Sequence, residues 1–126
     1  MRMSCAQRRL IATLGLLTLS VPLVAHHSGA MFDDTRSTTL TGTVKEFQWT
    51  SPHCWIQLLV ATDKDPDEWS IEMGPPSQLF KGGWRPATLK FGQTITVVVH
   101  PMRDGSHGGL FVSIAGADGH PIGPQK

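Results

Sequence analysis

The feature that most limits the fold of this chain is a set of short segments in which apolar and polar residues alternate. Residues rich in Gly, Pro and Asp separate these segments and are typical of turns. Successive side chains of a β-strand point to opposite faces, so each alternating segment predicts a strand with one buried face. The segments cover residues 38–49, 53–61, 68–73, 92–101 and 108–116.

The pattern changes between the third and fourth segments. In GPPSQLFKGGW (74–84), Ser77 could cap one or two helical turns that carry Leu79 and Phe80, and the Gly-Gly pair would end them. Three strands, a short helix and two strands is the order of a five-stranded, OB-like Greek-key barrel, so we expect an all-β fold with little helix. A small open sandwich is the alternative, because strand count does not prove closure.

A change of phase within the first segment indicates a β-bulge. Leu40 and Val44 share one face, but the apolar positions then move to Phe47 and Trp49, which have the other parity. One extra residue in a strand produces this shift, so we predict a bulge at Lys45-Glu46.

The strand faces also sort individual side chains. Cys54 falls on the apolar face of its segment, so we expect a buried core residue rather than a thiolate ligand. Trp49 and Trp69 have core parity as well. The inward set predicted for the last four segments is Cys54, Ile56, Leu58 and Val60; Trp69, Ile71 and Met73; Ile95, Val97 and Val99; and Leu110, Val112 and Ile114.

The N-terminus has the layout of a secretory signal peptide. Basic residues are followed by a mostly apolar run over residues 10–25, which ends at the small residue Ala25. A membrane-spanning helix needs about 20 apolar residues, so we expect cleavage and export to the periplasm, with an uncleaved anchor as the alternative. Cleavage after Ala30 competes with cleavage after Ala25. The predicted organisation is a signal peptide (1–25), an N-terminal segment (26–37) and one barrel domain with a Gly/Pro-rich tail (38–126).

Charge and motifs exclude several function classes. Three of the 11 basic residues and none of the 10 acidic residues lie in residues 1–25, so the remaining chain has eight basic and ten acidic residues and a net charge of −2. A mildly acidic domain without a basic cluster is a poor nucleic-acid binder, and we expect no membrane partner after cleavage. Cys54 would be the sole cysteine left, which excludes an internal disulfide. We find no catalytic constellation, and we expect a non-catalytic binding protein.

Four histidines are candidate metal ligands. If cleavage follows Ala25, His26 becomes the first residue, and its α-amine and imidazole Nδ1 can chelate one ion. His53 and His100 lie at strand ends outside the inward set and are the expected partners, with His27 as a spare ligand. A set of nitrogen ligands suits copper(II). The alternative is that the two strand-end imidazoles only bond to backbone.

A second hypothesis concerns the outward face of the second segment. Trp55 shares that face with His53 and Gln57, and such a face can stack a ring-shaped or sugar-like ligand or anchor a periplasmic protein partner. Arg103 is a further candidate contact for this ligand. The alternative is that Trp55 is covered by the N-terminal segment.

Five stretches of this chain resemble a family of small exported bacterial proteins, the domain of unknown function 6152. They are AHHSGAMFDD, LTGTVKEFQWTSPHCWIQL, EWSIEMGPPSQLFKGGW, GQTITVVVHPMRDGSHGGL and ADGHP. The resemblance implies export and favours a cut after Ala25, but it implies no activity. The family pattern has Asn where Ser51 stands and usually an aliphatic residue where Cys54 stands, which supports Cys54 as a core residue.

Overall fold

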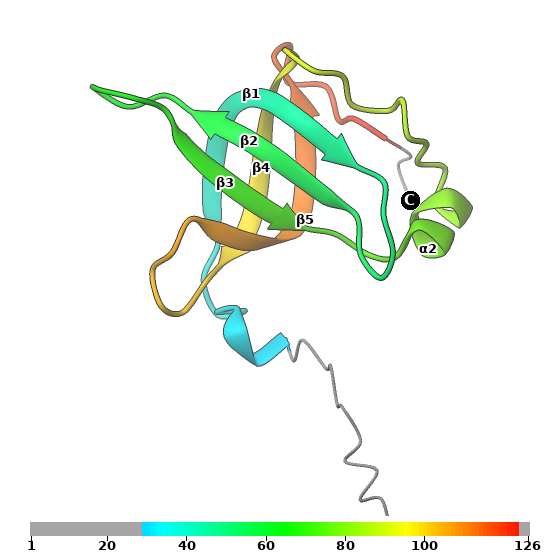
Figure 1. Cartoon of the computed structure of the whole chain (residues 1–126), viewed down its shortest axis with the longest axis horizontal. Coiled ribbons are helices and arrows are strands. Elements are labelled where there is room, and N and C mark those ends of the chain that lie inside the picture. The colour runs from blue at the N-terminus through cyan, green and yellow to red at the C-terminus, as the bar shows by residue number, and fades with distance from the viewer. Residues whose placement is uncertain (1–28, 124–126) are drawn as a thin grey trace, which may run out of the picture.

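Five strands close into a barrel in the computed structural model of the protein, which describes residues 29–123 (Figure 1). The strand order is β1-β2-β3-β5-β4, and β4 pairs with β1 to complete the ring. All pairs are antiparallel except β3 with β5. The predicted OB-like barrel is therefore confirmed, and the open sandwich is not formed. The elements are η1 (Gly29–Met31), β1 (Thr38–Gln48), β2 (Trp55–Val60), β3 (Asp67–Glu72), α2 (Pro76–Lys81), β4 (Thr94–Pro101) and β5 (Gly108–Gly116).

The long strand β1 closes the barrel by bending from one neighbour to the other. Its first half pairs with β4, and its second half pairs with β2. The register with β2 shifts between Val44 and Glu46, so the predicted bulge is confirmed at Lys45. Gly42 lies close to the backbone of β2, and a Cβ there would overlap the carbonyl oxygen of Leu59. This position requires glycine for the close backbone contact.

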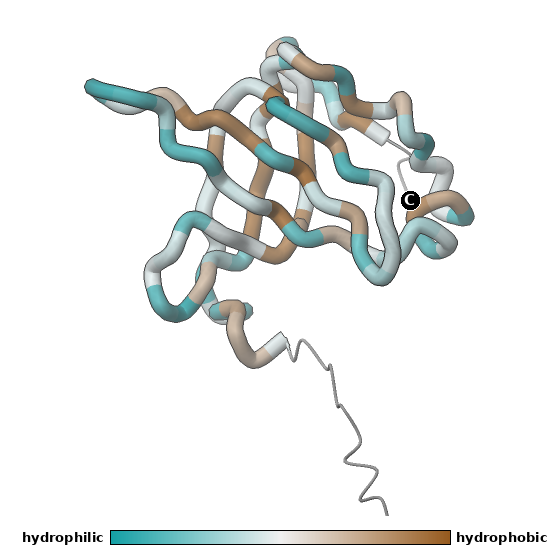
Figure 2. The backbone as a smooth tube through the Cα atoms, viewed as in Figure 1, coloured by the Kyte–Doolittle hydropathy of each residue, from teal (hydrophilic) through white to brown (hydrophobic). Residues whose placement is uncertain are grey.

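The barrel interior is filled by the alternating apolar residues of the strands. Hydropathy alternates along the strands in Figure 2, as expected for one face in the core. Cys54 is fully buried, as predicted, and Trp49 and Trp69 are partly buried against the core. Burial of one large aliphatic side chain contributes about 1.5–3 kcal/mol. The largest fully buried side chains are Ile56, Leu58, Ile71, Ile95, Val44, Val97, Val99 and Cys54.

The predicted inward face of β5 is wrong in its first half. Val112 is 45% exposed and Leu110 is half-buried, whereas Phe111 packs against the core. In the pairing with β4, Val98 faces Ser113 and Val99 faces Phe111, so Val112 is an extra residue in β5. This bulge reverses the parity, and of the predicted inward set of β5 only Ile114 is buried.

The short helix α2 lies between β3 and β4 as expected, but Ser77 does not cap it. The helix begins at Pro76 after Pro75, and no side chain caps it. Proline suits the first turn because its fixed φ is helical and it has no N–H to satisfy there. The helix ends at Gly82, and Gly83 has a φ of 87°, so the Gly-Gly pair terminates it as predicted.

The N-terminal segment is attached to the turn between β4 and β5. Phe32 is buried and pairs with Met102, the Asp33 amide donates to the Pro101 carbonyl (2.8 Å), and the Arg103 amide donates to the Met31 carbonyl (2.9 Å). Figure 1 shows this segment below the barrel, beside the β4–β5 turn. Within residues 29–123, no helix has the length and apolar character needed to span a membrane.

Candidate functional site

One row of paired residues runs around the outside of the barrel. Their strand neighbours Val99, Ile71 and Ile56 are buried, so the residues of this row point outward. We call it the outer row; in the order β4, β5, β3, β2 and β1 it consists of His100, Leu110, Glu72, Trp55 and Gln48.

Glu72 is the only charged side chain that is buried among the described residues, and it is bonded to His53. His53 Nδ1 lies 2.5 Å from Glu72 Oε1, and the two side chains are 29% and 7% exposed. A buried carboxylate is costly unless it is hydrogen-bonded, so Glu72 requires this partner. Nδ1–H donates to the carboxylate, which leaves Nε2 of the neutral ring as the nitrogen that can accept a ligand.

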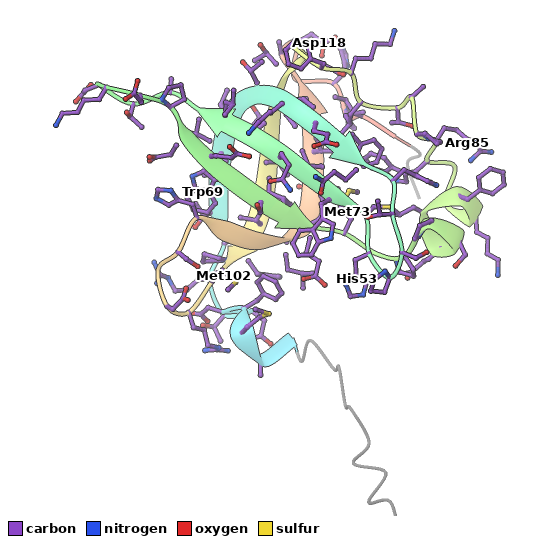
Figure 3. The ribbon with its side chains drawn as sticks, in the orientation of Figure 1. His53, Trp69, Met73, Arg85, Met102 and Asp118 are labelled. Carbon is purple, nitrogen blue, oxygen red and sulfur yellow. The ribbon has the colours of Figure 1, made fainter. Side chains whose placement is uncertain are left out.

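The backbone around His53 is held by the β1–β2 loop and by the residues that follow β3. Thr50 Oγ1 donates to the His53 carbonyl (3.0 Å), and the next residue exchanges backbone bonds with Met73 and Gly74. The Cys54 amide donates to the Gly74 carbonyl, and the Met73 amide donates to the Cys54 carbonyl. His53 therefore lies at a supported strand entry, which is visible beside Met73 in Figure 3.

Cys54, next to His53, points the other way, into the core. Desolvation raises the pKa of the Cys54 thiol, and the thiol donates a long hydrogen bond (3.9 Å) to the Thr50 carbonyl. The thiol is therefore protonated and takes no part in the outward-facing site.

His100 is oriented in the same way as His53. Its Nδ1 lies 2.7 Å from the backbone carbonyl of Arg36. A carbonyl oxygen can only accept, so Nδ1 carries the hydrogen and Nε2 of the neutral ring is again left for a ligand. This contact fits the predicted alternative that a strand-end imidazole bonds to backbone, and it also fixes the tautomer.

Two strands, β5 and β3, lie between His100 on β4 and His53 just before β2. His100 pairs with Leu110, and Leu110 pairs with Glu72, so the Cα atoms of His100 and Glu72 are about 10 Å apart at the usual strand spacing. Among residues 29–123, no three His, Cys, Asp or Glu side chains converge into a group that could hold a metal. His26 and His27 lie outside the described residues.

Trp55 and Gln57 share the outward face of β2, as predicted, but the amide of Gln57 is already engaged. Gln57 Nε2 donates to Gln48 Oε1 (3.2 Å), and Ser70 Oγ donates to Gln57 Oε1 (2.7 Å). A ligand that uses Gln57 would have to replace one of these bonds. Trp55 itself is half-buried in the outer row.

Arg103 is directed to the N-terminal segment rather than to Trp55. Its Nε donates to the Ala30 carbonyl (3.0 Å), and its terminal nitrogens lie 3.7 Å from Asp33 and 3.5 Å from Asp34. The Thr35 hydroxyl, which donates to Asp33 (2.6 Å), lowers the pKa of that carboxyl, and the charge of Arg103 adds to this effect. Arg103 thus attaches residues 30–34 to the β4–β5 turn.

His107, in the β4–β5 turn, stacks on Trp69 with ring centroids 5.1 Å apart and an interplanar angle of 17°. Its Nε2 lies 3.7 Å from Asp67, and its side chain is about half exposed, in line with its turn sequence. Its contacts are with Trp69 and Asp67 rather than with Glu72 or the Arg36 carbonyl, so it offers a matched control for His53 and His100.

Sequence reasoning missed Glu72, the residue that orients His53. Its outward parity in EWSIEM was visible, but so was that of Glu68, which is exposed and pairs with Lys45. Only the three-dimensional packing shows that Glu72 is buried and that Glu68 is exposed.

The geometry defines a class of protein: a small OB-type barrel with two oriented imidazoles on its outer surface. The chain belongs to the family of unknown function DUF6152, whose model matches residues 13–112, so the resemblance seen in the sequence is confirmed. No curated protein and no solved structure matches the chain.

Proposed function

We propose that this protein is an exported, periplasmic, non-catalytic module that binds a transition-metal ion through histidine, with copper(II) as the best-suited ion. Imidazole nitrogens suit copper, and copper(II) has the highest affinity of the divalent first-row metals for such sites. The ligands in this proposal are His53, His100 and the terminal pair His26 and His27.

The observation that carries the proposal is the bond between His53 and the buried Glu72 (2.5 Å). Metal-ligating histidines usually donate their second ring N–H to a carboxylate or a backbone carbonyl, which sets the tautomer and raises the basicity of the ligating nitrogen. His53 has the carboxylate form of this arrangement, and His100 has the carbonyl form.

The attachment of the N-terminal segment supports a contribution from the terminal pair. Phe32 pairs with Met102, two residues beyond His100. Positions 26 and 29 are three residues apart in the chain, and extended chain covers at most about 11 Å over that distance. A histidine at position 26 is therefore covalently restricted to the neighbourhood of the segment that His100 contacts.

The test is titration of the secreted protein with copper(II) in competition with a chromophoric chelator. His53→Asn removes the ligating imidazole but keeps an amide that can donate to Glu72, and we expect it to weaken binding at least about tenfold. His107→Asn is the matched control and should leave the affinity unchanged. Equal affinities for wild type and both variants would refute a site at His53.

N-terminal sequencing of the secreted form tests the terminal pair separately. A mature chain that begins at His26 supports its contribution, whereas one that begins at Met31 removes His26 and His27 from the site.

The alternative function, binding of an organic ligand or protein partner at Trp55, has less support. The amide of Gln57 is engaged by Gln48 and Ser70, and Arg103 is engaged by the N-terminal segment. Quenching of tryptophan fluorescence by candidate ligands in metal-free buffer, lost in Trp55→Leu, would favour this alternative over metal binding.

A further inference from the structure

A groove of about 1220 Å³ lies between α2, the outer face of β4 and β5, and the C-terminal residues that follow β5. Its volume exceeds the range of about 300–1,000 Å³ that is usual for small-molecule pockets. Figure 1 shows α2 and the chain after β5 on the same side of the barrel, next to β5. The groove shares no residue with the outer row.

The groove is mainly apolar, and part of its apolar surface is uncovered. Leu79 of α2 and Ile122 of the C-terminal segment flank it, and both pack against the core. Trp84 and Phe111 line it as an edge-to-face pair with centroids 5.9 Å apart. Val112, the residue that the β5 bulge turns outward, lines the groove and is 45% exposed.

The charge of the groove is unusual for this chain. Its lining contains no Asp or Glu, and Lys81, at the end of α2, is its one charged residue. No carboxylate of residues 29–123 lies within ion-pair distance of Lys81, although the chain after residue 25 has an excess of acidic residues. An apolar surface with a single cation at its edge is complementary to an apolar anion.

We propose that this groove binds a monomeric apolar carboxylate, with an alkyl or aryl chain along Trp84, Phe111 and Val112 and the carboxylate at Lys81. Burial of the chain supplies most of the binding free energy, because each buried methylene contributes about as much as a partly exposed ion pair. Lys81 supplies the preference for an anion. This site does not depend on the metal proposal.

The experiment is titration of the secreted protein with octanoate, octanol and octyltrimethylammonium, followed by NMR shifts of backbone amides. We expect shifts at α2, β5 and residues 121–122, and octanoate should bind about two- to fivefold more tightly than octanol. Lys81→Gln should abolish this preference while octanol binding is retained. Lys64→Gln, an exposed lysine in the turn between β2 and β3, is the matched control and should keep the preference.

Val112→Asp gives a second test that does not depend on Lys81. The side chain is exposed, so the variant should fold with an unchanged melting temperature, and its carboxylate should weaken octanoate binding more than octanol binding. The proposal is overturned if no probe binds, if octanoate and octanol bind equally, if the cationic probe binds best, or if the shifts lie outside the groove. Copper(II) affinity should be the same in Lys81→Gln and in wild type, so failure of one proposal leaves the other intact.

Discussion

The outer row and the groove next to α2 are two surfaces of the same barrel that differ in how far their side chains are engaged by neighbours. In the outer row and directly beside it, the polar side chains are already held by neighbours: Glu72 holds His53, a backbone carbonyl holds His100, and Gln57 lies between two polar partners. In the groove the surface is apolar and partly uncovered, and Lys81 has no carboxylate partner among the described residues. The first surface therefore suits the proposed metal ion, which needs nitrogen ligands in fixed orientations, and the second suits the proposed apolar anion, which gains from removal of its alkyl chain from water.

The largest expected effect is the protection of the Cys54 thiol from reaction, which measures how rigid the outer row is. Cys54 is the buried residue between His53 and Trp55 of that row. Its thiol is fully buried, and burial raises its pKa. We expect a disulfide reagent at about pH 8 to react about a thousandfold more slowly with the native protein than with the unfolded chain, since reaction requires opening. The thiolate absorbance released over time measures this rate. Reaction at nearly the unfolded rate would show that the strand carrying His53 is mobile.

Leu58→Ala tests the hydrophobic core of the barrel, on which both surfaces are built. Leu58 is fully buried in β2, and its truncation should lower the free energy of unfolding by about 2–5 kcal/mol, through lost transfer energy and a residual cavity. Leu59→Ala is the matched control on the outward side of the same strand and should cost clearly less. Urea denaturation followed by tryptophan fluorescence measures both. Equal losses would mean that the two faces of β2 are not distinct in solution.

Glu72→Gln tests whether the outer row orients its ligand. An amide keeps the shape but is a weaker acceptor for Nδ1–H, so copper(II) affinity should fall about 10–100-fold. Glu68→Gln, an exposed carboxylate on the same strand, should have no effect. Competitive titration measures both variants. An unchanged affinity in Glu72→Gln would mean that Glu72 serves only the fold.

The smallest effect concerns the attachment of the N-terminal segment to the β4–β5 turn. Bonds from Thr35 lower the pKa of Asp33 below 3.8, so the folded state favours the ionised carboxyl. The stabilising contribution is present above the unfolded pKa and is lost as the pH falls through the lower folded pKa. We expect faster amide exchange at Arg103 as the pH is lowered from about 5 to about 2, after correction for intrinsic exchange. Thr35→Val should move this change to higher pH; an identical profile would exclude Asp33 as the responsible group.

The two bulges show how much of the fold could be predicted. In β1 the apolar positions change parity from Val44 to Phe47 across polar residues, so the bulge leaves a visible trace in the sequence. In β5 the residues Leu110, Phe111 and Val112 are consecutive and all apolar, so either parity is consistent with the pattern. Pairing with β4 decides between them, because it sets Phe111 opposite Val99.

The candidate site also has some features that the sequence predicted and others that only the structure showed. Alternation alone placed His53, Trp55 and Gln57 on the outward side and Cys54 in the core, because the side-chain period of a strand is local. It could not show that Glu72 is buried, since that depends on which strand lies beside β3. It also could not show that Arg103 holds the N-terminal segment, which is about 70 residues distant in the chain.

The amino-acid sequence by itself determined the strands, their inward faces in β2, β3 and β4, the short helix and its glycine end. These features follow from the period of side-chain direction and from backbone preferences, which act over a few neighbouring residues. Tertiary structure alone decided which strands pair, that β3 and β5 run parallel, that Val112 turns outward, and that Glu72 meets His53. These outcomes depend on contacts between residues far apart in the chain, where the energy of closing and packing the barrel outweighs any local preference.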